Sequence, residues 1–247
     1  MQMNTESLQQ VNSQKACIVV PCYNECENIP LIIDQIKSMR DDGKLLDFDF
    51  VFVNDGSKDN SYSLIEEASK KYNWVKLQNH PVNKGFAAGL TTGRKYALNN
   101  LYGYIGQIDC DLTHPLNLLI TMFSYFPEYD LVIASRYVAD GGMKNVPLWR
   151  VLVSKGGQFA FKILFGLKTK DATSGFRLCK REVFEQIDLK ENTFAIQLEL
   201  TVKAEKMKFK IKEIPFVLTN RELGSSKFSI KQYIIYAKSM YRIWLNK

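Results

Sequence analysis

Residues 16–25 read ACIVVPCYNE, an apolar run that gives way to a short polar stretch. The unbroken apolar part, Ala16–Pro21, is typical of a strand that is buried on both faces. Pro30 follows closely and suits the first turn of a helix, so we expect a helix around Leu31–Met39. The sequence therefore opens with a buried strand, a polar loop and a helix, which together form the repeating unit of an α/β fold.

The same alternation continues along the next hundred residues. Strand and helix patterns that alternate at this spacing predict an α/β fold with a mainly parallel central sheet and helices on both faces. The expected strands are Ala16–Pro21, Phe48–Val53, Trp74–Gln78, Tyr104–Ile108 and Asp130–Ala134. The expected helices after the first are one that ends at Lys71, then Lys84–Leu98 and Pro115–Phe126.

The composition favours one globular domain. The chain has 247 residues, of which 46% are hydrophobic and 12% aromatic, which is enough to bury one large core. Residues 1–15 are polar and lack the apolar segment of a secretory signal, so we expect them to form a disordered tail. No stretch approaches the roughly 18 apolar residues that a membrane-spanning helix requires.

The cysteines and the glycine loops exclude some classes of site. The five cysteines form an odd set without a Cys-x-x-Cys pair, which favours reduced thiols in a cytoplasmic protein over disulfides or a zinc site. No Gly-x-x-x-x-Gly-Lys-Ser/Thr loop occurs, which argues against a P-loop nucleoside triphosphatase.

The net charge of +7 is unevenly distributed. Residues 141–170 contain six Lys or Arg residues and no Asp or Glu, interleaved with apolar side chains. This mixture suits an anionic membrane surface, but a core helix with its lysines in water has the same composition, so both interpretations stay open. Residues 228–247 predict an amphipathic helix, for which membrane adsorption, docking to a membrane partner and packing on the domain are all open. Its expected apolar stripe is Tyr233, Ala237, Met240, Tyr241 and Trp244.

Polar residues follow several of the predicted strands. The carboxyl ends of parallel strands face one crevice, and ligands bind there. An acidic crevice in a basic protein is costly unless a cation occupies it. The clusters expected at this crevice are Pro21–Glu25, Asn54–Ser57 and Asp109–Asp111.

Asp109 and Asp111 stand two positions apart after the fourth predicted strand. In an extended segment their side chains share one face and can hold one metal ion. Hard carboxylate oxygens favour Mg²⁺ or Mn²⁺, for which a diphosphate is a natural further ligand. The alternative is a pair of exposed loop aspartates, with Thr113 as the cap of the next helix.

Short polar and glycine-containing motifs stand in a definite order along the chain. They are Pro21-x-Tyr23-Asn24-Glu25, Asn54-Asp55-Gly56-Ser57-x-Asp59, Asn83-Lys84-Gly85, Asp109-x-Asp111, Ser135-Arg136-Tyr137, Ser174-Gly175-Phe176-Arg177 and Arg221-x-x-Gly224-x-Ser226-Lys227. This ordered series resembles family 2 glycosyltransferases, and within them the dolichyl-phosphate mannose synthase group. The resemblance implies a GT-A fold over 16–227, with a Rossmann-like nucleotide-sugar half at about 16–112 and an acceptor half at 113–227.

The resemblance also implies roles for individual residues. Asp109 and Asp111 would hold Mg²⁺ or Mn²⁺ on the diphosphate, and arginines would grip the acceptor phosphate bidentately. The implied donor-binding residues are Pro21, Tyr23, Asn24, Glu25, Asp55, Lys84, Asp109, Cys110 and Asp111. The implied acceptor-phosphate residues are Arg136, Arg150 and Ser154. The residues implied to act in catalysis are Asp109, Asp111, Arg136, Arg221 and Lys227.

The implied reaction is inverting transfer of a hexose, mannose from GDP-mannose, onto a polyprenyl or dolichyl phosphate. The enzyme would act peripherally at the cytoplasmic face of a membrane. An acceptor phosphate is largely ionised near neutral pH, so it needs no strong general base. Asn54 and Thr113 depart from the family pattern and leave base selectivity and metal affinity open.

Other functions stay open on the sequence. UDP-glucose is the alternative donor, and a family 2 enzyme acting on a water-soluble glycan would need a general base, for which Glu199 is the candidate. A sugar-1-phosphate nucleotidyltransferase would need a glycine-rich, arginine-containing opening that this chain lacks. A non-catalytic nucleic-acid or lipid-binding module would explain the positive charge but not the carboxylate clusters, and we expect no nucleic-acid partner.

Overall fold

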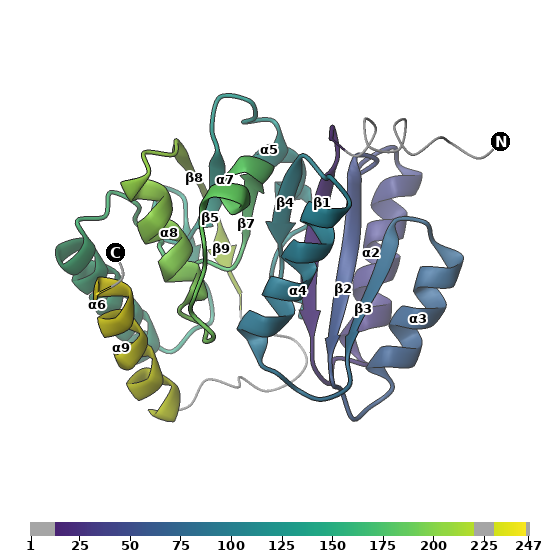
Figure 1. The fold of residues 1–247 in the computed structure, drawn as a ribbon, viewed down its shortest axis with the longest axis horizontal. Coiled ribbons are helices and arrows are strands. Elements are labelled where there is room, and N and C mark those ends of the chain that lie inside the picture. The colour runs from purple at the N-terminus through teal and green to yellow at the C-terminus, as the bar shows by residue number, and fades with distance from the viewer. Residues whose placement is uncertain (1–12, 220–229, 246–247) are drawn as a thin grey trace.

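The expected alternation of strands and helices is present in the first half of the chain (Figure 1). A computed structural model describes residues 13–219 and 230–245. Each of the five expected strands is found within two residues of its expected bounds. The elements are β1 (Ala16–Cys22), α2 (Asn28–Asp41), β2 (Phe48–Asp55), α3 (Ser61–Lys71), β3 (Val75–His80), α4 (Phe86–Asn99), β4 (Tyr104–Gln107), α5 (Asn117–Phe123) and β5 (Leu131–Ser135).

The second half adds elements that the sequence patterns did not define. The basic segment 141–170 forms a long helix, and two short strands pair away from the main sheet. The elements are β6 (Gly142–Met143), α6 (Leu148–Phe165), β7 (Arg177–Lys180), α7 (Arg181–Gln186), α8 (Ile196–Lys206), β8 (Ile211–Pro215), β9 (Val217–Leu218) and α9 (Ile230–Leu245).

The central sheet has seven strands in the order β3-β2-β1-β4-β7-β5-β8. The first four run parallel to one another and β5 runs parallel to β8, whereas β7 is antiparallel to both of its neighbours. The strand order reverses at β1, which has β2 on one side and β4 on the other. Ligands of open α/β sheets bind beyond the carboxyl ends of the strands at such a point, so the loops after β1, β2 and β4 mark the expected site.

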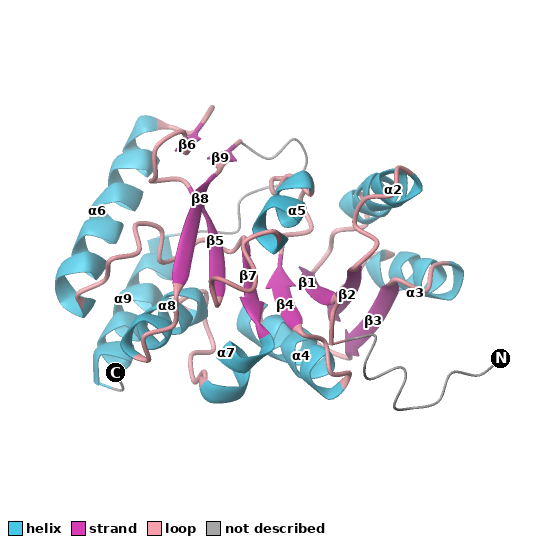
Figure 2. Cartoon of the chain, turned by 90° about the horizontal axis from the view of Figure 1, so that it is seen from above, coloured by secondary structure: helices cyan, strands magenta, loops and turns pink. Residues whose placement is uncertain are grey.

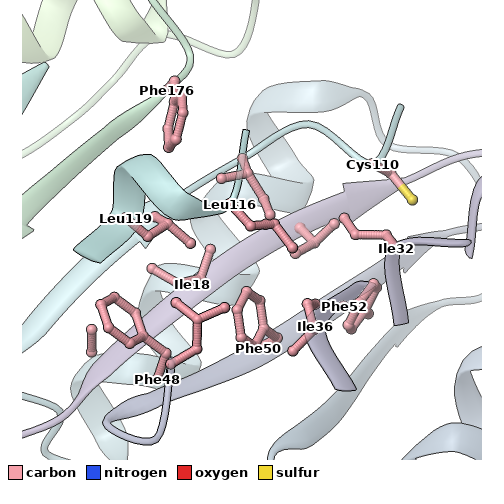
Figure 3. Close-up of a cluster of buried hydrophobic side chains, with 14 of the residues drawn as sticks. Ile18, Ile32, Ile36, Phe48, Phe50, Phe52, Cys110, Leu116, Leu119 and Phe176 are labelled. Atoms are coloured by element: carbon pink, nitrogen blue, oxygen red, sulfur yellow. The ribbon is translucent and has the colours of Figure 1, made fainter. Parts of the chain in front are cut away.

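Both faces of the sheet are covered, as expected. Ile18 and Val20 of β1 belong to the core under α2, α3 and α5, where Phe50 of β2 lies close to Ile18 (Figure 3). Cys17 and Val19 point the other way, into the core under α4. Seen from above, α2 and α5 lie on one side of the sheet and α4 and α7 on the other (Figure 2). Successive side chains of β1 point to opposite faces of the sheet and therefore pack into two different cores.

Helix α4 approaches β1 closely because Gly93 has no side chain. A Cβ atom added at Gly93 would lie 2.3 Å from Val19 Cγ1, whereas one added at Gly89 would lie 3.4 Å from Pro21 Cβ. The first distance is a clash and the second is an ordinary contact.

Helix α5 is shorter than the expected Pro115–Phe126. The N–H of Leu118 donates to the Pro115 carbonyl, and the N–H of Phe126 donates to the Phe123 carbonyl. These three-residue bonds are typical of tighter turns at helix ends, so the helical pattern in the sequence extends beyond the regular α-helix.

Helices α6 and α9 lie side by side at the end of the domain (Figure 1). Phe161 and Phe165 of α6 share a core with Tyr236, Met240 and Ile243 of α9. Within the described part of α9, the side that faces the domain therefore differs from the expected stripe, because Tyr241 and Trp244 are exposed. Tyr233 and Ala237 also belong to the expected stripe, but their side chains are not among those that the structure describes. Over residues 13–219 and 230–245, no helix is long and apolar enough to cross a membrane.

Candidate active site

The loops that follow β1 and β2 are tied to each other. The backbone N–H of Asn24 donates to Ser57 Oγ at 3.0 Å, and Asn24 Oδ1 accepts from the N–H of Lys58 at 2.8 Å. Two more bonds between the loops join the N–H of Glu25 to Ser61 Oγ and the N–H of Cys26 to Asp59 Oδ2. The first two polar clusters therefore stand together at the carboxyl edge of the sheet, with Asn24 exposed and Pro21, Tyr23 and Glu25 half-buried.

Asp55 is buried and engaged within the protein. Its Oδ1 accepts from His80 Nδ1 at 2.7 Å and from the N–H of Lys84 at 2.9 Å, and its Oδ2 accepts from the N–H of Gly85 at 2.8 Å. The carboxylate therefore holds the loop before α4, and the expected contact between Asp55 and the donor stays a prediction. The Lys84 side chain projects from that loop and is exposed.

Asp109 and Asp111 lie beyond β4, in a segment that is not extended as the sequence argument assumed. β4 ends at Gln107, and a turn begins at Cys110 and continues into Leu112 at φ 62°. Asp111 is 7% exposed, and its Oδ1 accepts from the N–H and the hydroxyl of Thr113 at 3.2 and 2.6 Å. Thr113 therefore orients Asp111 and does not cap α5. The Asp109 side chain is 34% exposed.

The two carboxylates are oxygen ligands of the kind that Mg²⁺ or Mn²⁺ prefers. Within the described residues, no group of three or more His, Cys, Asp or Glu side chains could hold a metal ion. Mg²⁺ is commonly bound through one or two carboxylates together with substrate phosphates and water. Asp109 and Asp111 can supply two such carboxylates.

His114 lies against Asp109 and was not anticipated from the sequence. Its Nδ1 accepts from the backbone N–H of Asp109 at 3.0 Å, and its Nε2 lies 3.8 Å from Asp109 Oδ2. Because Nδ1 is the acceptor, the neutral ring carries its proton on Nε2, on the side of the carboxylate. The ring stacks on Phe176 with the two centroids 4.7 Å apart. These contacts place His114 where it can orient Asp109.

The Ser174–Arg177 motif reaches the same aspartate from the second half of the chain. A Cβ atom added at Gly175 would lie 3.7 Å from Asp109 Oδ1. Arg177 is fully buried and donates to main-chain carbonyls, among them that of Ser174. Burial lowers the pKa of Arg177 to about 10. This arginine therefore holds the motif in place from within the core.

Cys110 does not present its side chain to a ligand. It is buried in the core that includes Ile32 and Leu116 (Figure 3). A hydrogen bond with Cys22, together with burial, raises the pKa of the Cys110 thiol well above its usual value. Only the backbone of Cys110 can take part in the expected donor contact. All five cysteines are free thiols.

On the acceptor side, Arg136 is held by Asp171. Its Nε donates to Asp171 Oδ2 and its Nη2 to Asp171 Oδ1, each at 2.8 Å. The bidentate face expected to grip a phosphate is thus occupied by a carboxylate, and Nη1 is the guanidinium nitrogen that makes no hydrogen bond within the described chain.

Helix α6 carries Arg150 and Ser154, the other two residues expected to bind the acceptor phosphate. Ser154 Oγ and Tyr137 Oη are 2.6 Å apart, which ties α6 to the residue after Arg136. Arg150 lies one turn earlier on α6, is exposed, and has its guanidinium carbon 5.3 Å from the centroid of the Trp149 ring. The structure therefore joins Ser154 to the residue after Arg136 and places Arg150 one helical turn before Ser154, while Arg221 and Lys227 lie outside the described residues.

The sequence identifies the family. Residues 17–188 match the profile described as Glycosyl transferase family 2. The chain is a family 2 glycosyltransferase. This confirms the resemblance seen in the ordered motifs, and it makes the chain an enzyme of the expected class.

Three relatives of the glycosyltransferase have names that agree with one another. It is 32% identical over 222 residues to the polyprenol monophosphomannose synthase of Mycolicibacterium smegmatis, covering 88% of this chain and 82% of the relative. It is 30% identical over 232 residues to the dolichol-phosphate mannosyltransferase of Pyrococcus furiosus, covering 93% of this chain and 63% of that longer relative. It is 27% identical over 214 residues to the undecaprenyl-phosphate mannosyltransferase of Micrococcus luteus, with coverage of 85% and 86%.

Solved structures confirm the GT-A fold of the glycosyltransferase. Glucosyl-3-phosphoglycerate synthase from Mycobacterium tuberculosis in complex with Mg²⁺ and uridine-diphosphate matches 100% of this chain and 84% of its own, with a TM-score of 0.67 and 16% identity. The same enzyme with Mn²⁺, uridine-diphosphate and glucosyl-3-phosphoglycerate gives a TM-score of 0.68 at 16% identity. At this identity the likeness concerns the fold alone.

Glu199 of the glycosyltransferase does not serve as a free base. It is 2% exposed, and its carboxylate accepts from the N–H groups of Lys190 and Glu191. Lys203 Nζ completes the arrangement at 2.6 Å from Glu199 Oε1. Every one of these partners is part of the fold, so Glu199 joins α8 to the segment before it.

Proposed function

We propose that this glycosyltransferase transfers a hexose, mannose from GDP-mannose, to the phosphate of a polyprenyl or dolichyl phosphate. The names of the three relatives support this acceptor class and this sugar. The observation that favours a phosphate acceptor over a hydroxyl acceptor is that the Glu199 carboxylate is bonded within the protein. A hydroxyl acceptor needs a base to remove its proton, and the candidate base of the second half is buried and bonded to the backbone.

A phosphate acceptor removes that need, because a phosphate monoester is largely ionised near neutral pH. Arg150 and Ser154 would bind its oxygens, and Arg136 would contribute Nη1 while Asp171 fixes the rest of its guanidinium. Arg221 and Lys227 are the further basic positions that we assign to this site. Attack by the phosphate oxygen in a single displacement would invert the anomeric centre.

On the donor side, we assign Pro21, Tyr23, Asn24 and Glu25 to the nucleoside and Lys84 to the diphosphate. Asp109 and Asp111 would hold Mg²⁺ or Mn²⁺, with Thr113 bonded to the carboxylate of Asp111 and His114 bonded to the backbone N–H of Asp109 and close to its carboxylate. A divalent cation bound there offsets the charge of the departing nucleoside diphosphate.

We place the enzyme at a membrane surface through α6 and α9. The core-helix interpretation of residues 141–170 does not fit α6, of which only Phe161 and Phe165 are buried. Trp149 and Phe159 are 56% and 65% exposed, and Tyr241 of α9 is 64% exposed. Apolar side chains set among lysines suit the boundary between head groups and acyl chains. Alternatively, a membrane partner subunit would bind the same exposed face of α6 and α9.

The reaction is tested by supplying labelled GDP-mannose or UDP-glucose with a polyprenyl phosphate in detergent, with Mg²⁺, with Mn²⁺ and with chelator. We expect a metal-dependent lipid-linked mannose of inverted configuration. The variant Asp111→Asn should lose this product, whereas Asp34→Asn, which changes an exposed carboxylate of α2, should retain it. Product formed from UDP-glucose alone would mean that the donor is UDP-glucose and not GDP-mannose. A retained anomeric configuration would contradict the single displacement.

A further inference from the structure

A basic hollow lies between α6 and the segment that follows it. Its volume is about 250 Å³, and four lysines, Lys155, Lys162, Lys168 and Lys170, contribute to its lining together with Tyr137 and Phe159. Lys155 and Lys162 are seven residues apart, so they project from the same face of α6. Arg136, Arg150 and Ser154 are not part of this lining, and the hollow lies directly beside Ser154, whose Oγ is 2.6 Å from the hydroxyl of Tyr137 in the lining.

The positive charge of the hollow is not neutralised by ion pairs. None of the four ammonium groups is paired with a carboxylate in the described part of the chain. The neighbouring Glu205 and Glu213 use their oxygens to accept backbone N–H groups of residues 168–171. Four like charges around one small volume repel one another, and an anion in the hollow would relieve that repulsion.

The apolar surroundings indicate the kind of anion. Phe159 in the lining is 65% exposed, and Ile163 and Leu164 on the next turn of α6 are also exposed. An anion that carries hydrocarbon chains can place its charge among the lysines and its chains along this exposed surface. A free anion without hydrocarbon chains would contact the lysines but not the exposed apolar side chains.

We propose that this hollow binds the phosphate head group of an anionic phospholipid. The site would hold the enzyme at the membrane in a fixed orientation, with the acceptor residues of α6 beside it. This rests on the proposed membrane contact and extends it from a surface to a defined site. It would be a second phosphate-binding position that adjoins the proposed acceptor site and uses other cations, the lysines of the hollow.

The test is sedimentation of the full chain with vesicles of phosphatidylcholine alone or with added phosphatidylglycerol. The variant carries Lys155→Gln and Lys162→Gln, and its matched control carries Lys71→Gln and Lys95→Gln on α3 and α4, across the domain from α6 (Figure 1). Each lysine near an anionic surface contributes about fivefold to binding, so the first pair should weaken binding to the anionic vesicles about 25-fold. The control pair removes the same charge and should change little.

Two further arms identify the source of the phosphate. Glycerol phosphate at constant ionic strength should displace the wild type from anionic vesicles if the hollow is a site, and should not if the attraction is diffuse. Inorganic phosphate that competes equally well would mean that the hollow recognises a free anion and would overturn the lipid assignment. If the Lys155→Gln, Lys162→Gln variant and the Lys71→Gln, Lys95→Gln control bind anionic vesicles equally, the proposed site is wrong. If the wild type binds neutral and anionic vesicles equally, the site is also wrong, but the apolar membrane contact remains.

Transfer activity in detergent separates this proposal from the proposed function. The Lys155→Gln, Lys162→Gln variant should retain transfer to a polyprenyl phosphate in detergent, because neither lysine belongs to the assigned donor or acceptor residues. A wild type that transfers no sugar but still prefers anionic vesicles would contradict the proposed reaction and leave the lipid site standing.

Discussion

The guanidinium of Arg136 is clamped by the carboxylate of Asp171 through two hydrogen bonds of 2.8 Å each. Burial by itself lowers the pKa of Arg136, but the hydrogen bonds and the charge of Asp171 raise it above its ordinary value. Arg136 is therefore a fixed cation with a fixed direction. Asp171 acts as a positioning residue, since it meets the proposed acceptor only through Arg136.

Replacing Asp171 by Asn should cost stability and acceptor affinity together. Asp171 is completely buried, so its loss leaves Arg136 without the partner that offsets its desolvation. Removing one member of a buried pair costs on the order of 3 kcal/mol, measurable by urea unfolding. The KM for polyprenyl phosphate should rise while the KM for the donor stays the same. As a control, Asp41→Asn removes an exposed i,i+4 pair with Lys37 and should leave both quantities unchanged. Equal unfolding curves for Asp171→Asn and the wild type would refute this role.

Replacing His114 by Phe should weaken metal binding. Phe retains the ring that stacks on Phe176 but loses both nitrogens that face Asp109. Groups that orient a metal ligand commonly change metal affinity by about tenfold or more. We expect a loss of about that size in Mn²⁺ affinity, measured by calorimetry with a nucleoside diphosphate present. His114→Asn, whose amide oxygen can still accept from the Asp109 N–H, should lose less, and unchanged affinity in His114→Phe would assign the ring to packing only.

Gly93 and Gly89 of α4 should respond differently to Ala. The new methyl group at Gly93 would overlap the Val19 side chain, whereas the one at Gly89 would make an ordinary contact with Pro21. Overpacking of this kind costs about 1–3 kcal/mol, while Gly89→Ala gains from the better helix propensity of Ala. Urea unfolding of the two variants measures the difference. A Gly93→Ala protein as stable as the wild type would mean that α4 can move away from β1 freely.

Acidification should loosen α9. Arg242 donates to both carboxylate oxygens of Glu191, at 2.8 and 3.0 Å. Burial alone raises the pKa of Glu191, but the hydrogen bonds and charge of Arg242 lower it overall. A carboxyl group with a depressed folded-state pKa stabilises the fold above its unfolded pKa, and this contribution disappears as the pH falls through the folded value. Hydrogen exchange of residues 236–245 should therefore accelerate in acid after correction for the intrinsic rate. Glu191→Gln should remove this dependence, and an identical response in both proteins would exclude the pair as its source.

The sequence predicted the elements whose pattern is local. The strands β1 to β5 are found where apolar runs such as Ala16–Pro21 indicate them, because burial on both faces leaves a continuous signal. β7 was not predicted, since it begins at Arg177, whose buried charge is satisfied by backbone carbonyls that no sequence pattern reveals. The stripe of α9 was misplaced because the buried face of a helix depends on what it packs against.

The sequence predicted which residues belong to the candidate site, but not which other residues of the protein bind them. Asp55 and Arg136 were expected to meet ligands, yet their partners His80 and Asp171 stand 25 and 35 residues away in the sequence. Such pairing is set by the fold and cannot be read from spacing. His114 could have been found from the sequence, because an imidazole three residues after Asp111 can turn back on the same loop.

The nucleophile that we propose is a phosphate on a polyprenyl chain. The decisive experiment offers the enzyme and GDP-mannose, in the presence of Mn²⁺, three acceptors in parallel: a polyprenyl phosphate, the same polyprenol without phosphate, and a water-soluble oligosaccharide. We expect labelled product from the polyprenyl phosphate only, because the described residues offer cations for a phosphate, whereas the Glu199 carboxylate is engaged by backbone N–H groups and is not free to deprotonate a hydroxyl. Mannose transferred to the oligosaccharide, with none on the polyprenyl phosphate, would contradict this proposal.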